Sequence, residues 1–315
     1  MKNMKYSPIG IPTLCRYEHF RRCVNSLQQN THANKTELVI ALDYPPSDKY
    51  MSGYNKISEF LNSIEGFAKV TVIRHKENKG AIANWKFLMN YLFSISDSII
   101  MTEDDNEFSP CFLDYMNKAL EKYKNNPKVY WVTGYAHPYM ENTTANNVLF
   151  KHGVCALGMG LWRDKEQIYQ QKDYKYFEGE VTNLKRLWNV LKRYPLGIPG
   201  EISMLYKKVD YSDIRKGIFC RTEDVFQLWP RVSMIRNWGF DGSGEHCGND
   251  PKFALQKIHI DNTFDLQDVP IQDSPKELQY DRWTKFTDNK IRLFILIIKV
   301  PIYLIGYNII RVFRK

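Results

Sequence analysis

Short apolar runs alternate with amphipathic segments along the first hundred residues. The runs are too short for helices and are typical of buried parallel strands. They cover residues 7–13, 37–42, 70–73 and 98–102. Between them, apolar residues recur at helical spacing, as at Phe20, Val24 and Leu27. This β-α-β-α-β-α-β order predicts an α/β fold, a Rossmann-like and mostly parallel sheet flanked by helices with right-handed crossovers.

The pattern continues less regularly in the second half of the chain. A helix is predicted over 112–123, strands over 129–133 and 232–235, and a largely helical, charged region over 165–196. Residues 153–162 are apolar and rich in glycine, which indicates either a close approach to a ligand or tight packing against a neighbour. The sequence leaves both interpretations open.

The last 26 residues, 290–315, form an apolar and basic segment. Lys299 and Pro301 interrupt an apolar run about as long as a transmembrane helix, which needs roughly 20 apolar residues. A basic segment with aromatic residues more often lies in the membrane interface and binds anionic headgroups. We therefore expect a C-terminal amphipathic, membrane-associated helix. A core helix that closes the domain and a single membrane span are the alternatives.

The distribution of charge argues against nucleic-acid binding. The chain has a formal charge of +9, and residues 290–315 hold six basic side chains and no acidic one. The rest of the chain is thus near neutral, at about +3, and lacks the basic face that nucleic acid requires. The scattered cysteines, none in a CxxC pair, predict free thiols in a reducing compartment. The N-terminus has no apolar run typical of a secretory signal, so we expect a cytoplasmic protein.

Three adjacent acids, Glu103, Asp104 and Asp105, follow the apolar run at 98–102. Neighbouring carboxylates repel one another unless a cation lies among them. Ligands of open α/β sheets bind at the carboxyl ends of strands, and a divalent metal with phosphates would suit these oxygens. The alternative is a solvated acidic turn that caps the next helix. Because no GxGxxG follows the first strand, a dinucleotide oxidoreductase is disfavoured.

Taken in order, these motifs resemble a known family. Arg16 follows the first strand, the second strand ends at Asp43, and residues 78–80 read Asn-Lys-Gly before a helix; the acids at 103–105 come next. This set resembles the GT-A fold of nucleotide-sugar glycosyltransferases of the family-2 type. Later segments are similar to N-acetylglucosaminyltransferase I and to bacterial polysaccharide-assembly transferases that carry GFDGSG-x-HC. They cover 128–134, 153–162 and 232–247.

The resemblance implies roles for the residues around the donor. Asp105 would ligate the Mn²⁺ or Mg²⁺ ion that bridges the donor diphosphate. Glu103 and Asp104 would face the ribose and the sugar, or hold metal-bound water. Asp43 would accept a hydrogen bond from uracil and Arg16 would contact the base or a phosphate, although a turn residue and a solvated helix-start cation are the alternatives. The other expected donor-binding residues are Thr13, Asn78, Gly80, Asn84 and His246.

The resemblance also implies a catalytic base. An inverting transfer needs one carboxylate to deprotonate the acceptor hydroxyl while the metal stabilises the departing diphosphate. The family places this acid about twenty residues before the strand predicted at 232–235, and Asp213 matches that spacing. The family usually has tryptophan beside the acid, whereas this chain has Tyr211-Ser212. Glu178 and Glu180 are therefore the alternative bases, and a solvated helix-start role remains possible for Asp213.

These observations predict a metal-dependent glycosyltransferase with a single GT-A domain. Residues 1–108 would form its nucleotide-sugar-binding half and 109–260 its acceptor-binding and catalytic half, with a linker at 261–289 and the membrane-associated segment at 290–315. The expected partners are a UDP-sugar donor, a glycan or lipid-linked acceptor and the anionic inner face of the cell membrane, in surface polysaccharide synthesis. The alternatives are a non-catalytic nucleotide- or sugar-binding module and a basic membrane-interaction protein.

Overall fold

The computed structural model of the chain is built on one large mixed sheet. It describes residues 5–138, 147–193, 198–207, 212–242, 251–272, 298–307 and 309. In the sheet the strands follow the order β3-β2-β1-β4-β8-β6-β9-β7. Six of these strands share one direction, and only β8 and β7 run against their neighbours. The α/β architecture with a mostly parallel sheet, predicted from the sequence, is confirmed.

The elements follow the predicted alternation in the first half and become mainly helical in the second. The first half contains β1 (Ile9–Thr13), α1 (Tyr17–Gln28), β2 (Glu37–Leu42), α2 (Met51–Phe60), β3 (Lys69–Arg74), α3 (Ala81–Ile95), β4 (Ser98–Met101) and β5 (Asn106–Phe108). The second half contains α4 (Phe112–Tyr123), β6 (Val129–Thr133), β7 (Val148–Lys151), β8 (Met159–Trp162), α5 (Arg163–Gln170), α6 (Tyr174–Thr182), α7 (Leu184–Arg193), α8 (Ile198–Lys207), α9 (Ser212–Glu223), β9 (Phe226–Pro230), β10 (Ile235–Asn237) and α10 (Pro251–Ala254).

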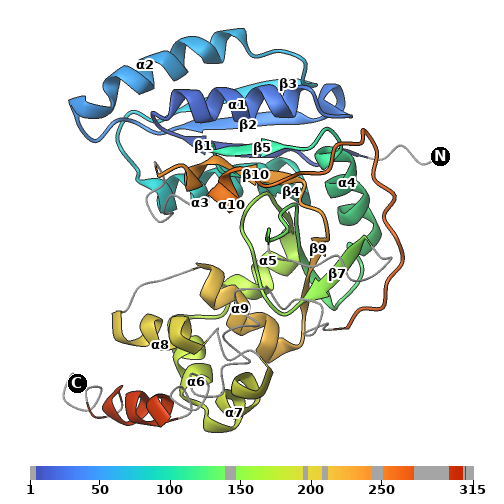
Figure 1. Ribbon diagram of the computed structural model, residues 1–315. Coiled ribbons are helices and arrows are strands. Elements are labelled where there is room, and N and C mark those ends of the chain that lie inside the picture. Colours follow the sequence, from blue (N-terminus) through green and yellow to red (C-terminus); the bar gives the residue numbers. More distant parts are fainter. Residues whose placement is uncertain are drawn as a thin grey trace.

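Two apolar cores lie on opposite faces of the sheet. In β2, Leu38, Ile40 and Leu42 belong to the core shared with α1 and α2, whereas Val39 and Ala41 belong to the core shared with α3. Figure 1 shows α1 and α2 on one side of these strands and α3 on the other. Successive strand residues point to opposite faces, so a strand buried on both faces needs an unbroken apolar run. This requirement explains the sequence ELVIAL of β2.

A small second sheet stands beside the carboxyl end of β4. Its two strands, β5 and β10, pair antiparallel, with Asn106 opposite Asn237 and Phe108 opposite Ile235. The sequence analysis did not predict β5, and it placed the later strand at 232–235 instead of Ile235–Asn237. Strands of three residues carry too little periodicity to be recognised alone, because their partner lies far away in the sequence.

The glycines of the segment 153–162 serve close packing. A Cβ atom at Gly158 would lie 2.2 Å from Cδ1 of Ile235, and one at Gly160 would lie 3.0 Å from Cε of Met116. Gly158 also has a φ of 55°, which favours glycine. Of the two interpretations left open by the sequence, the tight-packing one describes these two positions.

A helical lobe, defined here as α6–α9 with residues 298–307, lies below the sheet in Figure 1. Residues 298–307 are helical, and Val300, Leu304 and Tyr307 are buried in the same core as Leu205 of α8. Part of the C-terminal segment is therefore an integral piece of this lobe. In the parts of the chain that the structure describes, every helix is too short or too polar to cross a membrane.

The segment predicted as a linker at 261–289 is described as far as residue 272. This part packs against α4. The backbone N–H of Phe264 donates to Asp114 at 2.9 Å, and the Lys118 ammonium donates to the Phe264 carbonyl at 2.7 Å. The Phe264 ring is 3% exposed and packs edge-on against Tyr115. The first part of the predicted linker is thus fastened to the domain by a buried aromatic side chain.

A buried ion pair fixes α9 against the sheet. The Lys216 ammonium of α9 donates to both Glu166 oxygens of α5, at 3.0 and 2.9 Å. The Trp131 indole of β6 donates to the same carboxylate at 2.9 Å. The pair joins one strand and two helices, and it determines how α9 lies over β6.

We expect Lys216→Met to lower the free energy of unfolding by about 3–5 kcal/mol, because it leaves the buried Glu166 carboxylate without its cation. The double variant Lys216→Met/Glu166→Gln should recover most of this loss, since glutamine keeps an acceptor for Trp131 and carries no charge. Urea unfolding of both proteins measures the difference. Equal destabilisation in the two variants would show that the unpaired charge is not the cause.

Candidate active site at the carboxyl ends of β1, β2 and β4

The three acids of the sequence motif lie where β4 ends, next to the end of β1. The Thr13 hydroxyl at the end of β1 donates to Oδ2 of Asp104 at 2.8 Å. Arg16, just before α1, donates to Oδ2 of Asp105 at 2.9 Å and also to Oδ1 of Asp104. Asp104 and Asp105 are both 6% exposed. The structure thus brings Thr13, Arg16 and the acids together, as parallel neighbouring strands require.

Asp105 is also held by residues that the sequence analysis did not assign to the site. The Asn237 amide donates to Oδ1 of Asp105 at 2.9 Å, and the backbone N–H of Trp238 donates to the Asp105 carbonyl at 2.9 Å. A Cβ atom at Gly239 would lie 2.7 Å from Oδ2 of Asp105. The signal available in the sequence was that this Asn-Trp-Gly run belongs to a segment shared with the family.

Negative charge is crowded at this point. Burial, with the charges of Asp105, Asp213 and Asp104, raises the pKa of Glu103 to about 8, although Arg16 acts against this. Burial alone would lower the pKa of Arg16, but Asp104 and Asp105 raise it overall, so its guanidinium stays charged. One arginine therefore faces several carboxylates and does not neutralise them all.

This donor set suits a divalent cation by its chemistry. The oxygens are hard ligands of the kind that Mg²⁺ and Mn²⁺ take. Burial first, and then the charges of Asp105, Asp213 and Asp104, raise the pKa of Glu103, and a bound cation would oppose both effects. Asp105 and Glu103 are the residues that would hold the ion. Within the described ranges, no three Asp, Glu, His or Cys side chains converge as a ready-made metal site. In this structure Arg16 supplies the positive charge next to Asp105.

Asp43, at the end of β2, anchors the loop before α3. Its carboxylate accepts the backbone N–H groups of Lys79 at 2.8 Å and Gly80 at 2.9 Å, and the Asn78 amide at 3.3 Å. The backbone N–H of Tyr44 donates to Oδ1 as well, at 2.9 Å. The structure brings Asp43, Asn78 and Gly80 together as a group. In this arrangement Asp43 organises the loop, and its expected contact with uracil stays a prediction.

Gly80 and Asn84 differ in their access to a ligand. Gly80 has a φ of 76°, and a Cβ atom built there would meet nothing within 4 Å, so open space adjoins this backbone. Asn84 is 2% exposed; its amide donates to the Ala41 carbonyl at 3.0 Å and its oxygen pairs with the His75 ring at 3.0 Å. Asn84 is thus buried between β2 and α3, where it joins the two elements.

Asp213, in the first turn of α9, lies near the acids that follow β4. Its charge contributes to the raised pKa of Glu103. Burial raises the pKa of Cys155 to about 12, and the charges of Asp213 and Glu103 add to the effect. Asp213 itself is exposed, yet desolvation by the surrounding protein raises its pKa, against the effects of Lys216 and of a hydrogen bond from Ser212. The candidate base is thus open to solvent and close to the donor-side acids.

The alternative bases, Glu178 and Glu180, lie in the helical lobe on α6, away from β4 (Figure 1). The Tyr307 hydroxyl donates to Glu178 at 2.6 Å. Glu180 accepts from Thr222 at 3.3 Å and lies 3.8 Å from Nε of Arg186. Both carboxylates therefore have partners that belong to the packing of this lobe.

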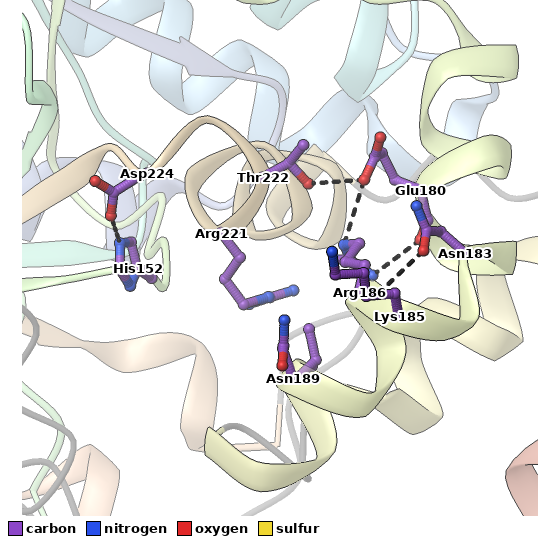
Figure 2. A pocket seen from close by; sticks show the side chains of 10 residues that line it. His152, Glu180, Asn183, Lys185, Arg186, Asn189, Arg221, Thr222 and Asp224 are labelled. Carbon is purple, nitrogen blue, oxygen red and sulfur yellow. Dashed lines mark hydrogen bonds and ion pairs between the residues drawn. The ribbon is translucent and has the colours of Figure 1, made fainter.

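Glu180 lines a cavity of about 320 Å³ between α6, α7 and the end of α9. Figure 2 shows the Arg186 and Arg221 side chains reaching into it, with His152 and Asp224 paired at its far wall. The fully buried Glu201 of α8 accepts from both arginines, from Arg186 of α7 at 2.8 Å and from Arg221 of α9. The two arginines of this cavity thus already face carboxylates.

His246, which belongs to the predicted donor-binding residues, lies outside the described residues.

Two solved structures show a distant likeness to this chain. The chain resembles the mannosyltransferase PcManGT from Pyrobaculum calidifontis, solved with GDP-Man and Mn²⁺, at 14% identity and a TM-score of 0.36, over 51% of this chain and 46% of that one. The likeness thus spans less than half of the mannosyltransferase. The chain also resembles a fragment of S. aureus TarS, at 10% identity and a TM-score of 0.35, over 69% of this chain and 71% of that one.

At these identities the likeness concerns the fold alone. The search of curated proteins gave no match. The family model described as glycosyl transferase family 2 matches residues 9–183, more than half of the chain, including β1 to β8 and the three acids. The resemblance inferred from the order of the motifs is confirmed, and the chain belongs to glycosyltransferase family 2.

Proposed function

We propose that the protein transfers a sugar from a nucleotide-diphosphate donor, a UDP-sugar, to a hydroxyl of a glycan or lipid-linked acceptor, with inversion and with Mn²⁺ or Mg²⁺. The proposed setting is the assembly of a surface polysaccharide on the cytoplasmic side of the cell membrane, to which residues 290–315 attach the enzyme. One observation carries the proposal: Asp213 lies close enough to the acids after β4 for its charge to raise the pKa of Glu103.

This arrangement supports a division of roles. The crowded acids with Arg16 provide a polar, charged end for the donor diphosphate, and Gly80 leaves open space beside the loop that Asp43 anchors. Asp213 belongs to a different element, α9, and is exposed, so that it can meet an acceptor. A donor side and a base side on separate elements are what a transfer between two substrates needs.

In the proposed reaction the carboxylate of Asp213 takes the proton of the acceptor hydroxyl. The oxygen attacks the anomeric carbon, the bond from that carbon to the diphosphate breaks, and the nucleoside diphosphate leaves with the electron pair. Arg16 exchanges its contacts with Asp104 and Asp105 for the diphosphate. When bound, the divalent ion supplies charge neutralisation for the leaving group.

We expect Asp105→Ala to abolish metal-dependent donor binding and Mn²⁺-dependent hydrolysis of the donor, while the fold persists because β4 and its core are unchanged. A thermal-shift panel of nucleotide diphosphate sugars with Mn²⁺ measures binding by the wild type and the variant. A wild type that is stabilised by donors yet never releases nucleoside diphosphate is a binding module, and the proposal fails. Donor affinity that survives in the variant removes Asp105 from the metal site.

We expect Gly239→Ala to weaken donor binding, because its methyl group would meet Oδ2 of Asp105 at 2.7 Å and push this carboxylate aside. A matched control is Gly179→Ala in α6, where an added Cβ meets nothing within 4 Å and alanine favours the helix. The control should bind donor like the wild type. Equal donor affinity in both variants would mean that the close contact at Gly239 does not position Asp105.

We expect Asp213→Asn to leave donor binding intact and to lower turnover by about a hundredfold or more, the usual scale for a general base. Because desolvation raises the pKa of Asp213, wild-type turnover should fall as the pH drops through a value above the ordinary aspartate pKa of about 3.9. Glu178→Gln and Glu180→Gln are matched controls. If either of them loses turnover and Asp213→Asn does not, the base lies on α6.

A further inference from the structure

Exposed apolar side chains gather on two helices of the helical lobe. On α7, Leu184 is 69% exposed and Trp188 is 51% exposed. The C-terminal helix over 298–307, with residue 309, exposes four isoleucines to between 47% and 62%. They are Ile298, Ile302, Ile305 and Ile309. Nearly half of the large exposed apolar side chains in the described ranges therefore lie on these two elements, and such a grouping is typical of an interaction surface.

The C-terminal helix has two apolar stripes on opposite faces. Val300, Leu304 and Tyr307 follow one another at spacings of four and three and are buried against the lobe. The four isoleucines repeat the same spacing two residues out of phase, which places them about 180° around the helix. A helix that needs only one face for packing does not need the second stripe, so the outer stripe serves another contact.

Helix α7 is divided in the same way. Leu187 is 3% exposed and Val190 is 4% exposed, and both lie in the core of the lobe. Leu184 and Trp188, one turn apart, point away from that core. Tryptophan is enriched at the boundary between membrane and water, because its ring is apolar and its N–H is polar.

Both helices border the same part of the lobe. Helix α7 contacts α6 and α8. The C-terminal helix contacts these two as well: Tyr307 donates to Glu178 of α6 at 2.6 Å, and its ring lies 5.7 Å from the ring of Tyr206 of α8. Figure 1 shows α7 and the C-terminal helix at the end of the lobe that faces away from the large sheet. The two helices thus lie at the same end of the lobe (Figure 1).

The basic composition of these two elements indicates what covers them. Helix α7 reads LKRLWNVLKR and contains no acid; its Lys185 is exposed, whereas its Arg186 pairs with Glu201 in the interior. By sequence, residues 290–315 contain six basic residues and no acid, and Lys299 among them lies exposed on the described helix. If two copies of the chain met through these helices, they would oppose like charges, which disfavours self-association. An anionic bilayer surface offers both an apolar layer and negative headgroups.

We propose that α7 and the C-terminal helix together form one bilayer-docking surface, in which Leu184 and Trp188 enter the interface beside the outer isoleucines. The proposal adds α7 to the membrane contact. It gives the C-terminal helix two roles, one stripe for the lobe and one for the lipid. It rests on the membrane attachment of residues 290–315 in the proposed function but not on the sugar transfer, and lipid binding is measured without a donor or acceptor.

The test uses the full-length protein and liposomes of neutral phosphatidylcholine, alone or with anionic phosphatidylglycerol. Three double variants are compared with the wild type by sedimentation. Leu184→Gln/Trp188→Gln alters α7, and Ile302→Gln/Ile305→Gln alters the C-terminal helix. Leu255→Gln/Ile260→Gln is the matched control, since these side chains are 68% and 81% exposed and lie outside both helices.

Wild type and control should partition into anionic liposomes and bind neutral ones less, with partial release by salt. Each of the two helix variants should lose about tenfold or more in partitioning, because two large apolar side chains no longer leave water, while the thermal midpoints stay near that of the wild type. Undiminished binding by the α7 variant overturns the proposal. So does a wild type that ignores liposomes and instead forms a dimer that either variant dissociates.

Discussion

The bridge from Arg16 to Asp104 and Asp105 is the interaction on which the rest of the site depends. Three consecutive acids at the end of β4 can be buried together only if positive charge stands against them. Arg16 provides it from the turn between β1 and α1, so this contact joins the start of α1 to the acids at the end of β4. Arg16 does not offset burial and the neighbouring carboxylates completely, because the pKa of Glu103 is still raised to about 8.

Residues from the second half of the chain also contact the acids that Arg16 bridges. Strand β10 pairs with β5 and delivers Asn237 and Gly239 to Asp105. Helix α9 brings Asp213 near enough to the acids for its charge to act on Glu103, and the buried pair of Lys216 with Glu166 joins that helix to α5. Residues 9–183, which carry the family match, therefore do not make the site alone. Its remaining members come from 213–239.

The sequence predicted those parts of the molecule in which local pattern and tertiary role coincide. Strand β2 was assigned as it stands, because a strand buried on both faces must be apolar throughout. Strands β5 and β10 were missed or displaced, since a three-residue strand is defined by a partner about 130 positions away. Asn237 was missed for the same reason. Asn84 was expected at the donor, but its helical neighbours do not reveal that it points into the interior.

The fully buried Glu201 has a consequence for how this lobe can change over time. Its carboxylate is shared by Arg186 of α7 and Arg221 of α9, so one anion balances two cations from separate helices. Loss of Glu201 would remove the carboxylate that both arginines share, which is strongly destabilising in a buried site, whereas loss of one arginine would leave Glu201 paired with the other. Homologous chains are therefore expected to replace Glu201 only together with Arg186 and Arg221, while either arginine can change with less effect as long as the other remains.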